Sequence, residues 1–526
     1  MDERTERLSG TGESGMQGVD GQIAGGQTGG GQVAGGQIAG GQTGGGQVAS
    51  GQTVGLREER DSLGVRTIPA DVYYGIHTQR AVENFPVSGR PANRQLLRAL
   101  ITVKKAAALA HLRLGTYPAE IAKAIATACD ELLADGDATA WERRWGKHFP
   151  VDSLQGGAGT STNLNVNEVI ANLAIERLGG QRGEYTLVHP LDHVNASQST
   201  NDVYPTALRI AAIRLLRRVS SAFAALQEAL QEKEQQFADV LKLGRTELMD
   251  ALPMMAGQGF GAYAKAIARD RWRLYKIEER LREVNIGGTA IGTGLNAPVK
   301  FTYYVTELLQ DLTGFGIARS EYPMDPTQNM DVFVEVSGLL KAAAVNLLKL
   351  SNDLRLLASG PAGGLGELEL PAMQAGSSIM PDKVNPVMAE MAGSVAMKVM
   401  ANDAAVTLAA SSGQLELNAF VPLIADALLD SLETLANAVR LFETRCVSGI
   451  GIRPDRCRES VERSAVLATA LVGHIGYEAS ARVAKRARLE GRTVREIVLE
   501  EGLVAAEEAD RILNPYQVTK PGIPGI

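Results

Sequence analysis

The sequence predicts a mainly α-helical protein built around a central bundle of long helices. Three stretches carry apolar residues alternately three and four positions apart, the spacing of a helix face that packs against other helices; they span residues 208–230, 267–284 and 336–357. Helices of this length extend about 30 Å or more at about 1.5 Å per residue. Strand-like alternation is scarce, and no typical hairpin dipeptide separates two β-branched runs.

The composition is that of a globular enzyme and disfavours two classes of partner. The chain has 526 residues, with 53 Lys and Arg against 60 Asp and Glu, which gives a net charge of −7. Nucleic acid and anionic membranes both attract basic proteins, so neither is the expected partner. No run approaches the ~20 apolar residues of a membrane helix, and the polar amino terminus predicts a cytoplasmic protein. The three cysteines lack Cys-x-x-Cys spacing, which fits a reducing compartment.

The chain divides into a tail and three expected domains. Residues 21–55 consist of seven pentapeptides of the form Gly-Gln-x-x-(Gly/Ser). So many glycines make ordering costly, and we therefore expect residues 1–56 to be a disordered tail, with a short solenoid as the alternative. The expected domains are an N-terminal helical domain at 57–198, the long-helix bundle at 199–450 and a small C-terminal helical domain at 451–526.

The most informative polar segment is residues 376–386, Gly-Ser-Ser-Ile-Met-Pro-Asp-Lys-Val-Asn-Pro. Its glycine and prolines exclude a regular helix, so it is expected to be a loop. Ser377, Ser378, Lys383 and Asn385 give this loop two hydroxyls, one ammonium and one amide. Such a set can hold a carboxylate, and a desolvated hydroxyl beside positive charge can accept a proton. The alternative is a surface turn with a solvated lysine.

Three further polar runs have unusual densities of small polar residues. Residues 156–163 and 198–202 each precede an apolar helical stretch, where hydroxyls and backbone N–H groups can bind anions or merely cap the helix. Residues 244–251 offer one cation, one hydroxyl and two carboxylates, although this run on its own is better explained as a solvated helix end. His189 and His193 lack the pattern of a zinc helix, so metal binding is not expected.

Taken together, these runs resemble the fumarase and aspartase superfamily of elimination enzymes. The segment Gly-Ser-Ser-Ile-Met-Pro-x-Lys-x-Asn-Pro is the signature of that superfamily. Within it, the chain resembles the aspartases most, from about residue 56 to the end; the similar segments are 69–78, 152–163, 193–206 and 512–523. The resemblance leaves the repeat tail unexplained.

The resemblance implies a three-domain, mainly α subunit in a homotetramer whose active sites are each assembled from three subunits. It implies reversible anti elimination of ammonia from L-aspartate to give fumarate, through an aci-carboxylate intermediate. No organic cofactor or essential metal is expected, and the expected partner is a small dicarboxylate or amino-acid substrate.

By motif position, the resemblance makes Ser377 the general base. Lys383 and Asn385 would bind the α-carboxylate together with Thr246. The groups expected around the β-carboxylate are Thr160, Ser199, Thr200 and Ser378. Asn201 would help to seat the amino group.

Several positions depart from the pattern of the superfamily. Glu247 stands where relatives commonly have His or Gln, near the expected leaving amine, and its charge favours an amine substrate over malate. The other departures are Asp382, Ala362 and Val421. They leave open a different amino dicarboxylate as the substrate. The competing interpretations are a class II fumarase and, from another class, a non-catalytic helical scaffold.

Overall fold

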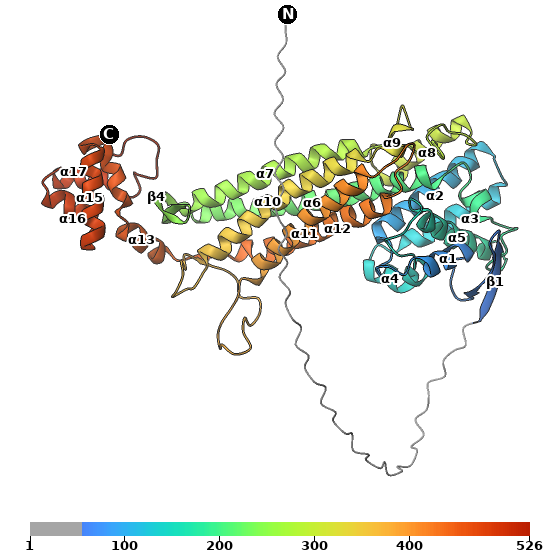
Figure 1. Ribbon diagram of the computed structural model, residues 1–526, viewed down its shortest axis with the longest axis horizontal. Coiled ribbons are helices and arrows are strands. Elements are labelled where there is room, and N and C mark those ends of the chain that lie inside the picture. The colour runs from blue at the N-terminus through green and yellow to red at the C-terminus, as the bar shows by residue number, and fades with distance from the viewer. Residues whose placement is uncertain (1–54, 526) are drawn as a thin grey trace, which may run out of the picture. The chain divides into compact units, whose positions relative to one another are not determined.

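The computed structural model describes residues 55–525, which are mainly helical (Figure 1). The predicted tail falls outside the described residues, apart from its last two positions, of which Leu56 begins strand β1. None of the described helices is both long and apolar enough to cross a membrane.

The N-terminal part begins with a hairpin that the sequence did not predict. Strands β1 (Leu56–Asp61) and β2 (Gly64–Pro69) pair antiparallel around a two-residue turn that lacks the usual Asn-Gly signal. Five helices follow: α1 (Ile76–Asn84), α2 (Arg94–Leu114), α3 (Ala119–Ala134), α4 (Ala138–Trp145) and α5 (Thr160–Arg177). A short π-helical turn, η2 (Pro190–Val194), leads to the central bundle.

The central bundle confirms the predicted helices. It comprises α6 (Thr200–Gln236), α7 (Ala256–Leu281), α10 (Asp331–Leu357), α11 (Val387–Ser411) and α12 (Val421–Arg445). Helix α6 packs against α7 and α12, and α11 packs against α10 and α12. The predicted apolar positions face inward, since Leu208, Leu215, Leu340 and Leu347 are fully buried. Burial of these leucines is the main stabilising contribution to the packing of each predicted helix face.

Helix α6 sets the length of this bundle. Its 37 residues span about 55 Å at about 1.5 Å per residue. A hairpin formed by β3 (Leu241–Thr246) and β4 (Met249–Met255) follows its C-terminal end. The remaining connecting elements are β5 (Glu283–Val284), α8 (Val299–Thr313), β6 (Ala318–Arg319), α9 (Asp325–Gln328) and β7 (Leu368–Glu369).

The C-terminal part has a small apolar core of its own, centred on Leu471, Val483, Ile497 and Ile512. Its elements are β8 (Gly451–Ile452), α13 (Pro454–Arg463), η4 (Ala465–Leu471), α14 (Val472–Ile475), α15 (Tyr477–Glu490), α16 (Val494–Glu500) and α17 (Ala506–Ile512). Helix α13 packs against β3, so this part of the chain lies beside the hairpin.

Candidate active site

Two helix starts lie together and bring four predicted site residues into one group. Thr160 is the first residue of α5, and Thr200 is the first residue of α6. The Asn163 amide joins the two helices because its Nδ2 donates to Thr200 Oγ1 at 3.1 Å. We call Thr160, Ser199, Thr200 and Asn201 the helix-start cluster. Two helix N-termini and their hydroxyls make this cluster favourable for an anion.

Ser199 also has the structural role of a helix cap. Its Oγ accepts from the backbone N–H of Asn201 at 3.2 Å, and its own N–H donates to the Asp202 carboxylate at 2.9 Å. This capping box fixes the first turn of α6. Asn201 Nδ2 donates to the carbonyl of Ala290 at 2.7 Å, so the cluster is tied to a distant loop. The cap interpretation of residues 198–202 is therefore confirmed, and a cap hydroxyl can still donate its proton.

A buried polar network supports the helix-start cluster from beneath. Lys104 of α2 is fully buried, and its ammonium donates to Asn195 Oδ1 at 2.8 Å and to Gln198 Oε1 at 3.0 Å. Burial lowers the pKa of Lys104 to about 7, while the nearby Asp202 carboxylate acts in the opposite direction. Sequence reasoning missed Lys104 and Asn195. Lys104 is one of two adjacent lysines, and only its position on the buried face of α2 separates it from the more exposed Lys105.

Thr246 and Glu247 lie at the tip of the β3–β4 hairpin, not at a solvated helix end as the alternative interpretation had it. Thr246 pairs with Met249, so Glu247 and Leu248 form a two-residue turn. Both turn residues have positive φ, 53° and 65°, which is the backbone of a type I′ turn normally made by Asn or Gly. Such a conformation is unfavourable for these two side chains and holds Glu247 at an exposed position.

Glu247 has no ion-pair partner among residues 55–525. Arg245, one candidate partner, instead donates to the buried carboxylate of Glu367 at 2.6 Å. Lys242 approaches the same carboxylate at 3.4 Å. An ion pair between Glu247 and Arg245 of the same chain, which is one alternative to ammonium binding by Glu247, is therefore not formed, and Arg245 pairs with Glu367 instead.

The loop at 376–386 is held mainly by its own hydrogen bonds. Ser377 Oγ accepts from the backbone N–H groups of Met380 and Ile379, at 2.9 and 3.2 Å. Two donors directed at one hydroxyl oxygen favour its deprotonated form. Lys383 Nζ donates to Asn385 Oδ1 at 2.8 Å, and Asn385 Nδ2 donates to the Gly376 carbonyl at 2.8 Å. Ser377 and Lys383 thus belong to one loop that is closed by hydrogen bonds between its own residues.

Gly376 and Asp382 define the backbone of this loop. A Cβ atom at Gly376 would lie 2.5 Å from the Lys383 carbonyl, so the closure of the loop requires glycine there. Asp382 adopts a φ of 63°. A left-handed backbone suits glycine, and Asp tolerates it better than most side chains do.

A single chain does not bring the predicted residues into one site. The helix-start cluster lies at the first residues of α6, whereas the Thr246–Glu247 tip follows the last ones. Helix α11 runs antiparallel to α12, because Lys398 contacts Asp430, whereas Asn402, four residues later, contacts the carbonyl of the earlier residue Ala427. The loop before α11 therefore lies near the C-terminal end of α12, which is also the C-terminal end of α6, since Lys233 donates to Ile450. About 55 Å of helix separates the helix-start cluster from the other groups.

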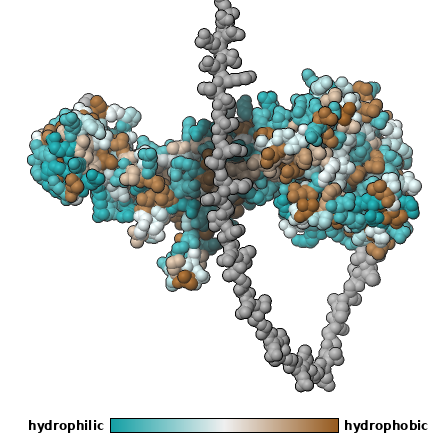
Figure 2. Space-filling view, viewed as in Figure 1, coloured by the Kyte–Doolittle hydropathy of each residue, from teal (hydrophilic) through white to brown (hydrophobic). Residues whose placement is uncertain are grey.

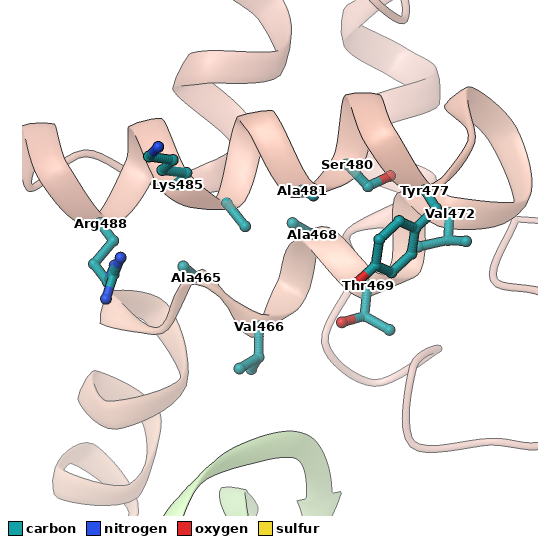
Figure 3. Close-up of a pocket in the computed structure, with 11 residues that line it drawn as sticks. Ala465, Val466, Ala468, Thr469, Val472, Tyr477, Ser480, Ala481, Lys485 and Arg488 are labelled. Carbon is teal, nitrogen blue, oxygen red and sulfur yellow. The ribbon is translucent and has the colours of Figure 1, made fainter.

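The cavity drawn in Figure 3 is separate from all these residues. It has a volume of about 490 Å³ and lies between η4 and α15, with Lys485 and Arg488 at its rim. None of the predicted site residues lines it. Within residues 55–525, no group of three or more His, Cys, Asp or Glu side chains is arranged to hold a metal ion.

Comparison with known proteins places the chain in a family of lyases. Residues 64–401 match the family described as Lyase, and residues 467–520 match Fumarase C C-terminus. The aspartate ammonia-lyase of Bacillus subtilis is 46% identical over 469 residues, which cover 89% of this chain and 97% of that protein. The aspartate ammonia-lyase of Escherichia coli is 44% identical over 468 residues, 89% of this chain and 96% of that protein.

Solved structures agree with this placement. A fumarate lyase:delta crystallin structure from Brucella melitensis superposes with a TM-score of 0.83 at 46% identity, covering 89% of this chain and all of that one. A class II fumarase from Schistosoma mansoni has a TM-score of 0.84 at 34% identity, with 89% and 99% covered. The chain belongs to the fumarase and aspartase superfamily of lyases, as its loop motif predicted.

Proposed function

We propose that the protein is an aspartate ammonia-lyase that eliminates ammonia from L-aspartate to give fumarate. The observation that carries this proposal is the loop geometry, in which two backbone N–H groups donate to Ser377 Oγ. The same loop carries the ammonium of Lys383, which donates to Asn385 Oδ1. The chain that carries this loop is 44–46% identical to proteins named aspartate ammonia-lyase. The reaction is reversible and needs no redox change.

The chemical difficulty is the removal of a weakly acidic C–H proton next to a carboxylate. Ser377 Oγ takes this proton from the β-carbon of L-aspartate, the C–N bond breaks on the opposite face, and ammonia leaves. The N–H groups of Ile379 and Met380 stabilise the serine alkoxide that acts as the base. Closure of the loop over the substrate excludes water and strengthens each of these interactions.

The remaining residues hold the two carboxylates and the amine. In this proposal, the helix-start hydroxyls of Thr160, Ser199 and Thr200, together with Ser378, surround the β-carboxylate, on which negative charge develops. Lys383, Asn385 and Thr246 bind the α-carboxylate. Asn201 and Glu247 seat the substrate ammonium, for which the unpaired carboxylate of Glu247 supplies the attraction.

This assignment requires more than one copy of the chain. The helix-start cluster and the Ser377 loop belong to opposite ends of the bundle, and a substrate the size of aspartate cannot reach both. Packing of central helices from different subunits, with opposite directions, can place the start of one α6 beside the end of another. We therefore propose a homotetramer with active sites shared between three subunits.

The surface of the central helices supports such an assembly. Large apolar side chains are exposed on it: Trp272 and Tyr275 of α7, and Met397 and Leu408 of α11 are each more than half exposed. Hydrophobic patches are visible among the hydrophilic residues in Figure 2. Exposed apolar side chains along a long helix are typical of surfaces that pack against another chain.

A direct assay tests the activity. The purified protein is mixed with L-aspartate and, separately, with L-malate, and fumarate is followed by its absorbance. We expect fumarate to form from L-aspartate at least ten times faster than from L-malate. Fumarate from L-malate alone would instead support the alternative, a class II fumarase, to which the chain has 34% identity in one structure.

Mixing two variants with strongly reduced but measurable activity tests the shared site. Ser377→Ala and Thr200→Val each remove one group, and within one chain the two residues lie at opposite ends of the helix bundle. If sites are shared, mixed oligomers formed after partial unfolding and refolding contain some sites with neither substitution, so activity returns. Each variant refolded alone is the control. Failure to regain activity, with mixed oligomers present, would show that each site uses one chain only.

A further inference from the structure

Asn195 is the centre of the buried network beneath the helix-start cluster. Its Oδ1 accepts three hydrogen bonds, from Lys104 Nζ at 2.8 Å, Asn167 Nδ2 at 3.1 Å and Asn163 Nδ2 at 3.2 Å. Asn163 and Asn167 lie four residues apart on α5 and are both buried. Of the two, only Asn163 also contacts the cluster.

The direction of each hydrogen bond in this network is determined by its fixed members. The carbonyl of Gln198 can only accept, and Asn195 Nδ2 donates to it at 3.2 Å. Asn195 must therefore direct its Oδ1 toward Lys104 and α5. Asn163 then directs its Nδ2 toward that oxygen, and one N–H of this amide donates to Asn195 Oδ1. The other N–H donates to Thr200 Oγ1 at 3.1 Å.

These hydrogen-bond directions determine the orientation of the Thr200 hydroxyl. Its oxygen accepts from Asn163, and its proton has no acceptor among residues 55–525. The hydroxyl is therefore oriented as a donor toward whatever occupies the cluster. Thr200 is also the first residue of α6, so its proton and the helix N-terminus favour the same kind of ligand.

The network leaves two buried oxygens without partners. Asn163 Oδ1 and Asn167 Oδ1 are both buried and accept no hydrogen bond from the described residues. Buried acceptors without a hydrogen bond reduce stability. Rotating both amides by 180° would exchange the positions of their oxygen and nitrogen atoms, but it would also break the hydrogen bonds that both amides donate to Asn195. The Asn163 amide thus continues to donate to Thr200 Oγ1, although two buried amide oxygens remain without a hydrogen bond.

We propose that Asn163 is a positioning residue that fixes the direction of the Thr200 hydroxyl, so that this group always donates to a bound carboxylate. The inference rests on the proposed function, in which Thr200 binds the substrate β-carboxylate. A hydroxyl committed to donation favours a carboxylate oxygen over an amide nitrogen, which needs an acceptor. Asn163 therefore contributes to the choice of substrate without touching it.

The test compares the same substitution at the two asparagines. Asn163→Asp keeps the size of the side chain but removes the N–H bonds, so Thr200 turns its proton to the new carboxylate. Asn167→Asp makes the same change at the same partner, Asn195, without contact to Thr200. We expect kcat/KM for L-aspartate to fall by about 10-fold or more in Asn163→Asp and by less than about 3-fold in Asn167→Asp.

A double-mutant cycle separates positioning from general damage. If Asn163 acts through Thr200, adding Asn163→Asp to Thr200→Val changes kcat/KM little beyond Thr200→Val alone. Multiplied effects in the double variant, or an Asn167→Asp loss as large as that of Asn163→Asp, would overturn the proposal. Should the Asp variants fail to assemble, Asn163→Ala and Asn167→Ala are compared by the same two criteria.

The wild-type protein separates this inference from the proposed function. If it forms no fumarate from L-aspartate, the proposed function fails. Succinate binding, measured by calorimetry on the same variants, then tests the Thr200 direction with a simple dicarboxylate. Weaker succinate binding in Asn163→Asp than in Asn167→Asp supports the positioning role, and equal or absent binding in wild type and both variants contradicts it.

Discussion

The helix-start cluster and the Ser377 loop are built in opposite ways. Thr200 is buried and Asn163 is almost fully buried, and their hydrogen bond joins residues 37 positions apart in the chain. Every hydrogen bond of residues 377–385 within the described part of the chain stays between residues 376 and 387. Ile379 of the loop is 84% exposed. The helix-start cluster is fixed by residues from distant parts of the chain, whereas the loop is held only by residues of the loop itself.

This difference assigns different tasks to the two regions. A buried network positions donors before the substrate arrives, and preorganised donors stabilise developing charge most effectively. An exposed loop with only local hydrogen bonds can close over a substrate, which excludes water and brings the base to the C–H bond. The exposed apolar residues Ile379, Met380 and Val384 give the loop side chains to bury when it closes. Substitutions in the loop should therefore affect turnover with little loss of stability.

Ser377→Ala is the strongest test of that division. Loss of a general base typically lowers turnover by ~10²–10⁴-fold. Because Ser377 bonds only within the exposed loop, we expect the melting temperature and oligomer size to be unchanged. Ser394→Ala, an exposed serine of α11, is the matched control and should keep wild-type turnover. Wild-type turnover in Ser377→Ala would remove this residue as the base.

Glu247→Gln tests the third region, the hairpin tip. The substitution keeps hydrogen bonding and removes the charge that is proposed to attract the substrate ammonium. A charge-assisted hydrogen bond is worth about 1.5–3 kcal/mol against ~1 for a neutral one, so kcat/KM for L-aspartate should fall roughly 5- to 30-fold. Any turnover of L-malate, which has no ammonium, should not fall.

The competing interpretation for Glu247 is an ion pair with an arginine of another subunit. Arg245 of the same chain is engaged by Glu367, and no other arginine among residues 55–525 pairs with Glu247. In that case Glu247→Gln would lower the melting temperature or dissociate the oligomer. An unchanged kcat/KM for L-aspartate with a lower melting temperature would therefore contradict the ammonium-binding role.

The sequence predicted the long helices well because their signal is repeated many times. Each apolar position along 208–230 and 336–357 adds to the same periodic pattern, and α6 and α10 contain these stretches. The hairpins β1–β2 and β3–β4 carried no such signal. Their turns lack Asn or Gly, and the four strands that do not form hairpins have two residues each. Short strands and atypical turns are fixed by tertiary contacts, which no local pattern records.

The resemblance to a known motif named more of the candidate site residues than the chemistry of the residues alone did. The loop residues and the helix-start hydroxyls were found because they form dense polar runs. Lys104 and Asn195 were missed because they lie 91 positions apart in the chain and no local pattern relates one to the other. Their importance appears only when α2, α5 and the segment before α6 pack together.

A buried histidine of the N-terminal part, His148, should make the stability of the protein depend on pH. His148 is buried, and its Nδ1 accepts from the backbone N–H of Tyr73 at 3.0 Å, which requires the neutral ring. Burial, with smaller contributions from Lys147 and Arg182, lowers the pKa of His148 from 6.5 to about 4. Protonation is therefore easier in the unfolded chain, and stability is lost as the pH falls from about 6.5 toward 4.

At pH 5 this difference corresponds to about 2 kcal/mol of lost stability. The measurement is the urea midpoint at pH 7.5 and pH 5. His148→Asn keeps an acceptor at the position of Nδ1 without a titrating ring, so its midpoint should change less between the two pH values. An equal change in both proteins would assign the pH dependence to other groups.

The smallest effect is expected from removing residues 2–54. Every residue proposed for the site lies between 160 and 385, and the hydrogen bonds described above for the helix-start cluster and the Ser377 loop join residues within 55–525. We therefore expect the shortened protein to keep wild-type kcat/KM for L-aspartate and the same elution volume on a sizing column. Lost turnover with an unchanged elution volume would mean that the removed segment acts on the loop. A smaller oligomer would mean that it contributes to subunit contacts, which the central helices alone are proposed to make.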